Sequence, residues 1–219
     1  MDLVELFRSA CEELQARNVQ FAVAGGFAAV LYRDEDRLTN DIDFAILSDS
    51  KNEQIAEQIF ERLGLDRIQI SRIADLEGGP MFAIKSKSTP PAILIGRKST
   101  EDKGPGVDFI LPTVPWVASA LLRAVANQVD FGFGKVPTLT IEDVIVAKLY
   151  ARKGNYRPKD EDDLLSIFAA NHQFDFDYLN AQMAKFGLPL PKTIRDKAPP
   201  ILIKISKTVE KQLRSQKMT

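Results

Sequence analysis

The stretch TNDIDFAIL, residues 39–47, decides how this chain is interpreted. Its second half is a run of apolar residues typical of a buried strand, and its first half places Asp41 and Asp43 two residues apart. Side chains at this spacing in a strand point to the same face, about 6.5 Å apart along the strand. At an effective dielectric constant of about 20, the two carboxylates repel by about 2.5 kcal/mol. A cation bound on that face would compensate the repulsion. The alternative is that the two aspartates are solvated or cap a turn and bind no metal.

The composition excludes several classes of protein. The chain has 219 residues, of which 45% are hydrophobic, and a formal net charge of −1. It can therefore bury a substantial core, and it lacks the basic balance of a general nucleic-acid binder. The single cysteine, Cys11, excludes a disulfide framework, and the single histidine, His172, argues against a histidine-rich metal site. Without a signal-peptide pattern or a long apolar run, we expect a soluble cytoplasmic protein with no membrane association.

The order of hydrophobic patterns predicts an α/β (α+β) fold. A mixed sheet flanked by helices is expected over residues 1–112, and a mostly helical part is expected over residues 113–219. We expect the two parts to border one cleft. The expected strands are 20–24, 41–47, 67–73, 81–85, 92–96 and 107–111, and the expected helices are 2–17, 27–33, 50–63, 113–126, 140–153, 160–171, 176–187 and the basic C-terminal segment.

A third carboxylate is available on a later strand. Asp108 is the only charged residue in the apolar run VDFIL, residues 107–111. If this strand pairs with 41–47, Asp108 could lie about 5 Å from the aspartate pair across the sheet. Carboxylate oxygens are ligands that Mg²⁺ prefers, and two-metal sites need such a third ligand. The alternative is an aspartate that simply faces water.

The segment before the aspartate pair has the order strand, Gly25-Gly26, helix. Backbone N–H groups at a helix N-terminus can cradle phosphate, and glycine allows the phosphate to approach closely. The same glycines also suit an ordinary tight turn. The phosphate and metal patterns are informative because they fall within one short unit.

AVAGGFAAVLYRDEDRLTNDIDFAI, residues 22–46, resembles the signature of the polymerase-beta-like nucleotidyltransferase superfamily. The sequence from Arg37 through Thr39 to Asp43 is most similar to the motif of the abortive-infection, AbiEii-type branch. That branch also carries a helix ending in Ala-Lys-Leu-x-Ala, a basic turn and Asp-x-x-Asp-Leu, which VIVAKLYARKGNYRPKDEDDLL, residues 144–165, resembles. Two departures are Gly26, where many relatives have serine, and the 64 residues between Asp43 and Asp108.

The resemblance implies a nucleotidyltransferase that moves an NMP from an NTP to a hydroxyl acceptor with two Mg²⁺ ions. The acceptor would be RNA or tRNA, a protein or a small molecule, and a toxin would have a cognate antitoxin. The implied catalytic and metal residues are Asp41, Asp43 and Asp108; the implied nucleotide-binding residues are Gly25, Gly26, Arg37, Thr39, Lys148, Asp160 and Asp163.

Other functions remain open from the residues alone. The alternative of another class is a non-catalytic nucleotide-binding or antitoxin-like module that retains the fold, and a third is an interaction protein with a solvated acidic face. Lys148 could also be an ordinary surface lysine. Residues 192–219 carry eight Lys or Arg and two acids, which suits either an RNA backbone or a solvated helix face.

Overall fold

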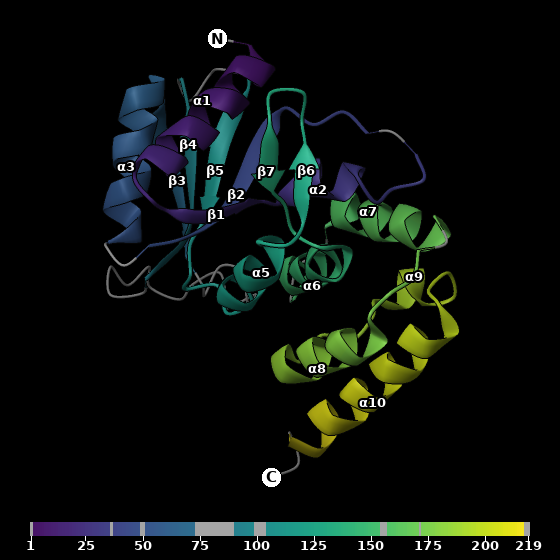
Figure 1. Cartoon of the computed structure of the whole chain (residues 1–219). Coiled ribbons are helices and arrows are strands. Elements are labelled where there is room, and N and C mark those ends of the chain that lie inside the picture. Colours follow the sequence, from purple (N-terminus) through teal and green to yellow (C-terminus); the bar gives the residue numbers. More distant parts are fainter. Residues whose placement is uncertain are drawn as a thin grey trace.

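The computed structural model describes residues 2–35, 37–48, 51–72, 90–98, 104–153, 157–170 and 172–216. The predicted strand 81–85 lies outside the described residues. The elements are α1 (Leu3–Ala16), β1 (Gln20–Val23), α2 (Gly25–Val30), β2 (Asp41–Leu47), α3 (Asn52–Leu63), β3 (Asp66–Arg72), β4 (Pro91–Arg97), β5 (Gly106–Ile110), α5 (Val117–Ala124), β6 (Gln128–Asp130), β7 (Lys135–Pro137), α6 (Ile141–Ala151), α7 (Pro158–Ala169), α8 (Phe176–Phe186), α9 (Lys192–Arg195) and α10 (Pro200–Gln216). The strands of the main sheet and helices α1, α2 and α3 come from the first 110 residues, and helices dominate the rest of the chain (Figure 1).

Within the described residues, the main sheet has five strands in the order β1-β2-β5-β4-β3. Strands β2 and β5 are parallel, and the other neighbouring pairs are antiparallel. The predicted mixed sheet with flanking helices is confirmed. The pairing of 41–47 with 107–111 places Asp43 opposite Asp108.

The two-residue period of β2 separates the faces of the sheet. Ile42, Phe44 and Ile46 are fully buried in the core formed with α1 and α3. Ala45 belongs to the other core, formed with α5, α6 and the later helices. Because alternate side chains point to opposite faces, Asp41 and Asp43 face the helical half. Figure 1 shows α1 and α3 together on one side of the strands, with α5 and α6 on the other.

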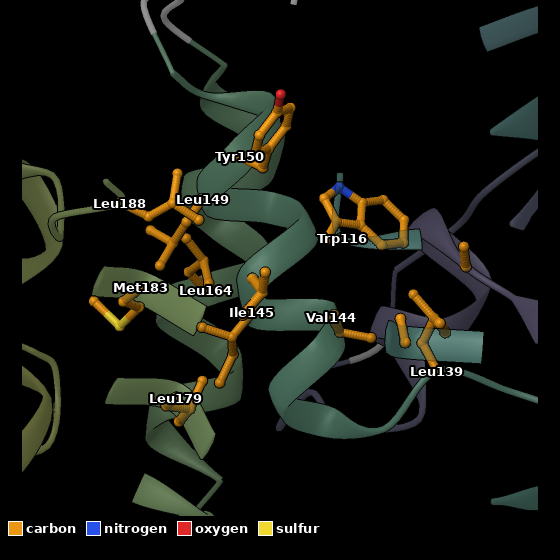
Figure 2. Close-up of a cluster of buried hydrophobic side chains, with 14 of the residues drawn as sticks. Trp116, Leu139, Val144, Ile145, Leu149, Tyr150, Leu164, Leu179, Met183 and Leu188 are labelled. Carbon is orange, nitrogen blue, oxygen red and sulfur yellow. The ribbon is translucent and has the colours of Figure 1, made fainter. Parts of the chain in front are cut away.

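Helix α6 is the centre of the helical half. Thr140 caps it by accepting a hydrogen bond from the Asp143 N–H, as the Thr-x-x-Asp pattern indicates. Its apolar residues are buried on more than one side, which is typical of a helix inside a core. Figure 2 shows Trp116 and Leu139 near Val144, while Leu164, Leu179, Met183 and Leu188 lie around Ile145 and Leu149. This packing fixes the position of Lys148 on the same helix.

The predicted helix start at Thr113 is wrong. Helix α5 begins at Val117 after Trp116. The Thr113 hydroxyl instead donates to the Pro91 carbonyl at 2.5 Å, at the start of β4. Thr113 therefore makes a tertiary hydrogen bond in place of the helix cap that the local sequence indicated.

The hairpin β6–β7 was not predicted. Gly132 and Gly134 adopt positive φ angles of 85° and 136° in its turn, and Phe131 and Phe133 pack against Phe7 of α1 at 4.9 and 5.1 Å between ring centroids. A segment of the second half therefore covers the first half. The division into 1–112 and 113–219 stays a prediction. None of the helices within the described ranges has the length and apolarity needed to cross a bilayer.

Candidate active site

The parallel pairing of β2 and β5 brings the three predicted carboxylates to one face. Asp41 pairs with Gly106, and Asp43 pairs with Asp108. Because paired residues in neighbouring strands share a face of the sheet, the side chains of Asp43 and Asp108 point the same way. The sequence analysis predicted this placement of Asp108 across the sheet from Asp43.

These carboxylates lie in a cavity of about 250 Å³ between the sheet and the helical half. Strand residues, the Gly-Gly segment and helices α6 and α7 all contribute to its wall. Apolar residues such as Trp116 and Val144 complete the lining. The predicted site residues that line the cavity are Gly25, Gly26, Arg37, Thr39, Asp41, Asp43, Asp108, Lys148 and Asp160.

The two glycines leave room for the side chains of the site. Gly25 has φ +56°, and a Cβ built there would lie 1.9 Å from Asp43 Oδ2. A Cβ on Gly26 would lie 2.8 Å from Thr39 Oγ1. The Gly26 N–H donates to Asp43 Oδ2 at 3.4 Å. The glycines therefore let Asp43 and Thr39 approach the start of α2, a role that the sequence analysis missed when it considered phosphate binding and a tight turn.

The electrostatics of Asp43 differ from those of a solvated aspartate. Burial, followed by the negative charge of Asp108, raises the pKa of Asp43 to about 7, although Lys148 opposes the change. Burial also raises the pKa of Asp108, against the lowering effect of Arg97. A raised carboxyl pKa means that the site disfavours its own negative charges and would gain from a bound cation.

Arg97 is a residue of this site that the sequence analysis missed. Its Nη2 lies 3.0 Å from Asp41 Oδ1, and its Nη1 donates to Asp108 Oδ1 at 2.7 Å. The available signal was an arginine that closes the apolar strand AILIGR, residues 92–97. Among the residues that the structure describes, no group of three His, Cys, Asp or Glu side chains stands in a metal-holding arrangement. The Arg97 guanidinium lies between two of the carboxylates, those of Asp41 and Asp108.

Lys148 reaches the cavity from α6 and is held there by two acids of α7. Its Nζ lies 3.0 Å from Asp160 Oδ1 and 2.5 Å from Asp163 Oδ2. The residue is only 7% exposed, so it is not an ordinary surface lysine. It links the helical half to the face that carries the aspartates.

Asp163 does not line the cavity, in contrast to the other predicted site residues. Its carboxylate is fully buried and also receives Arg33 Nη1 at 2.6 Å and Arg37 Nη1 at 2.5 Å. Asp163 was predicted to contact nucleotide, but its position does not support direct contact. The carboxylate instead orients two cations of the cavity wall, Arg37 and Lys148. The Ser166 hydroxyl accepts from two further N–H groups of the loop before β2. Helix α7 therefore anchors this loop.

The chain as a whole is similar to one family of known proteins. The sequence model of the family described as nucleotidyl transferase AbiEii toxin, type IV TA system, matches residues 11–214. No protein among the curated sequences matches the chain.

Solved structures of other proteins also resemble this chain. The antibiotic-resistance factor ANT(2'')-Ia gives a TM-score of 0.49 at 16% identity, covering 85% of this chain and 92% of that chain. JHP933 from Helicobacter pylori gives 0.45 at 14% identity, covering 99% and 94%. An antigenic nucleotidyltransferase-like protein from Paracoccidioides brasiliensis gives 0.44 at 17% identity, covering 90% and 88%.

Proposed function

The chain belongs to the AbiEii family of nucleotidyl transferase toxins, and from this premise we propose that it moves an NMP from an NTP to a hydroxyl acceptor in a Mg²⁺-dependent reaction. The observation that carries the proposal is the register of Asp43 with Asp108 on a cavity wall that also includes Lys148. The acceptor oxygen would form a bond to the α-phosphorus while the bond to the pyrophosphate oxygen breaks.

The chemistry of the donor set fits Mg²⁺. Asp41, Asp43 and Asp108 offer hard carboxylate oxygens on one face, and burial together with the charge of Asp108 raises the pKa of Asp43, so a bound cation would stabilise its charged form. These three residues would hold the metal once Arg97 releases two of them. Bound divalent ions would neutralise the triphosphate and activate the attacking oxygen.

The remaining residues of the cavity would bind and position the substrate. Lys148 and Arg37 supply positive charge for the triphosphate, and their common partner Asp163 keeps both side chains in place. Asp108 would accept the proton of the attacking hydroxyl. Thr39 and the Gly25-Gly26 backbone would border the nucleotide, and Asp160 would keep Lys148 oriented. Catalysis then comes mainly from positioning and charge neutralisation.

RNA is the acceptor that the surface favours. Helix α10 exposes four cations at helical spacing, Lys204, Lys207, Lys211 and Arg214, and such a stripe suits the phosphate backbone of RNA or tRNA. A protein hydroxyl and a small molecule are the other acceptors that fit the same chemistry. We also propose a cognate antitoxin, because the family is described as part of a toxin–antitoxin system. The chain would act in the cytoplasm.

One observation favours a second candidate, a non-catalytic nucleotide-binding module. Arg97 neutralises Asp41 and Asp108 through two ion pairs. If this arrangement persisted with nucleotide bound, the carboxylates would not be available for catalysis. Binding without transfer would then be the observed behaviour.

The test is incubation with each NTP labelled at the α-phosphate, Mg²⁺ and total cellular RNA or lysate, followed by sizing of the products. We expect label in one product class, and no label there with Asp43→Asn. Asp66→Asn removes the same charge at an exposed site on β3. This variant should transfer as much label to the product as the wild type does. Binding of Mg-NTP without label in any macromolecular or small-molecule product would favour the second candidate.

A further inference from the structure

Arg97 makes contacts that are unusual for the last residue of a strand. Its side chain is 12% exposed and bridges Asp41 on β2 and Asp108 on β5, with Nη–Oδ distances of 3.0 and 2.7 Å. It also donates to its neighbour's carbonyl, Gly96 O, at 2.7 Å. Two separate strands therefore contribute carboxylates to one guanidinium.

The path of this side chain is built into the neighbouring strand. A Cβ on Gly106 would lie 2.1 Å from Arg97 Nη1 and 2.4 Å from Arg97 Cδ. Only a residue without a side chain at position 106 lets the guanidinium cross β5 and reach the acids. Gly106 has no positive φ angle that would otherwise demand glycine. The glycine and the arginine thus form one structural unit.

A guanidinium and a divalent cation need the same partners. Arginine binds carboxylates through planar, charge-assisted hydrogen bonds that occupy the oxygen lone pairs, and a hard cation would coordinate those same oxygens. Their like charges also repel one another at short range. Both cannot occupy the position between Asp41 and Asp108 at one time.

We propose that Arg97 is an internal competitor of the divalent ion, so that the metal affinity of this site is set by release of the guanidinium from Asp41 and Asp108. The inference rests on the proposed function, in which these carboxylates hold the metal. Arg97 is accordingly a positioning residue: it controls when the carboxylates are free.

The test is calorimetric titration of the full chain with Mn²⁺ in the absence of nucleotide. Arg97→Met keeps a long side chain but removes the charge. Since each charged hydrogen bond to the acids is lost, Mn²⁺ should bind roughly tenfold more tightly or better. Arg67→Met is the matched control, because Arg67 pairs with Glu53 and Glu57 on the surface and its loss changes net charge equally. The control should leave Mn²⁺ affinity within about twofold of the wild type.

Gly106→Ala tests the same point without changing any charge. The added methyl displaces a flexible side chain rather than backbone, so the fold should persist while Arg97 is pushed off the acids. Mn²⁺ should again bind more tightly than to the wild type. This variant also carries the test if Arg97→Met does not fold.

The outcomes separate the two claims. Tighter Mn²⁺ binding by Gly106→Ala and Arg97→Met supports competition. Binding that Asp43→Asn weakens but that the position 97 and 106 variants leave unchanged, or weaken, overturns the inference and leaves the proposed function standing. Mn²⁺ affinity that is the same in the wild type and in Asp43→Asn contradicts the proposed function itself.

Discussion

Asp163→Asn should be the most destabilising isosteric change among the aspartates of the predicted site. Asp163 is fully buried and pairs with Lys148, Arg33 and Arg37 at 2.5–2.6 Å. Removing the charge leaves Lys148 with Asp160 at 3.0 Å and Arg33 with the exposed Asp162 at 3.0 Å, while Arg37 loses its ion pair. Removing one partner of a buried ion pair typically costs about 3–5 kcal/mol. We expect a loss of that size in the free energy of unfolding.

Urea unfolding of matched variants measures this cost. Asp162→Asn is the control, because its carboxylate is 65% exposed and contacts only Arg33 of the three cations that Asp163 binds. It should cost less than about 1 kcal/mol. The two variants should share the m-value of the wild type, so that a change in midpoint reports stability. Equal midpoints for Asp162→Asn and Asp163→Asn would refute the claim that Asp163 organises these cations.

The pH dependence gives a second check on Asp163. Burial alone would raise its pKa, but Lys148 and Arg37 together lower it below the ordinary value. A lowered pKa in the folded state adds stability that is complete above the unfolded value of about 3.9 and is lost as the pH falls below it. The gap between wild type and Asp163→Asn should therefore be full at neutral pH and shrink in acid. A gap that stays constant or widens in acid would contradict this assignment.

Three further changes have expected outcomes. Gly25→Ala should lower the unfolding midpoint in urea more than Gly64→Ala, because both have positive φ but only Gly25 would place a Cβ against Asp43; equal losses would show that backbone strain alone matters. In EDTA, the stability of wild type relative to Asp43→Asn should fall as the pH rises from about 4 to about 7, since the folded pKa is raised to about 7; a pH-independent difference would contradict the shift. Tyr178→Phe removes the 2.5 Å hydrogen bond to the buried Asp143 carboxylate and should cost about 1–3 kcal/mol in the same unfolding assay; no loss would mean that the other donors to Asp143 suffice.

Local patterns in the sequence were enough to predict the sheet and the family. The apolar runs in DIDFAIL and VDFIL indicated two strands, and the two-residue period of a strand placed Asp41 and Asp43 on one face. The structure pairs the two strands as neighbours. The predicted membership of the AbiEii-type nucleotidyltransferases is confirmed by the family match over residues 11–214. These signals succeed because strand period and motif order are properties of short segments.

Tertiary contacts were beyond the reach of local patterns. Arg97 joins the site only because β4 lies antiparallel to β5 and because Gly106 lets its side chain pass. Asp163 was predicted to bind nucleotide, yet its carboxylate is fully buried and pairs with Lys148, Arg33 and Arg37. Thr113 has the pattern of a helix cap but bonds Pro91 instead. In each case the deciding partner is far away in the chain.

The most direct test of nucleotidyl transfer compares NTP labelled at the α-phosphate with NTP labelled at the γ-phosphate, in the presence of Mg²⁺ and the acceptor fraction. The account predicts that the α-label enters the acceptor, that the γ-label leaves as pyrophosphate, and that Asp43→Asn reduces transfer by orders of magnitude while Asp66→Asn does not. Entry of the γ-label into the acceptor would indicate phosphoryl transfer instead. Transfer of the α-label at the wild-type rate by Asp43→Asn would contradict the central claim that the aspartates of β2 carry the reaction.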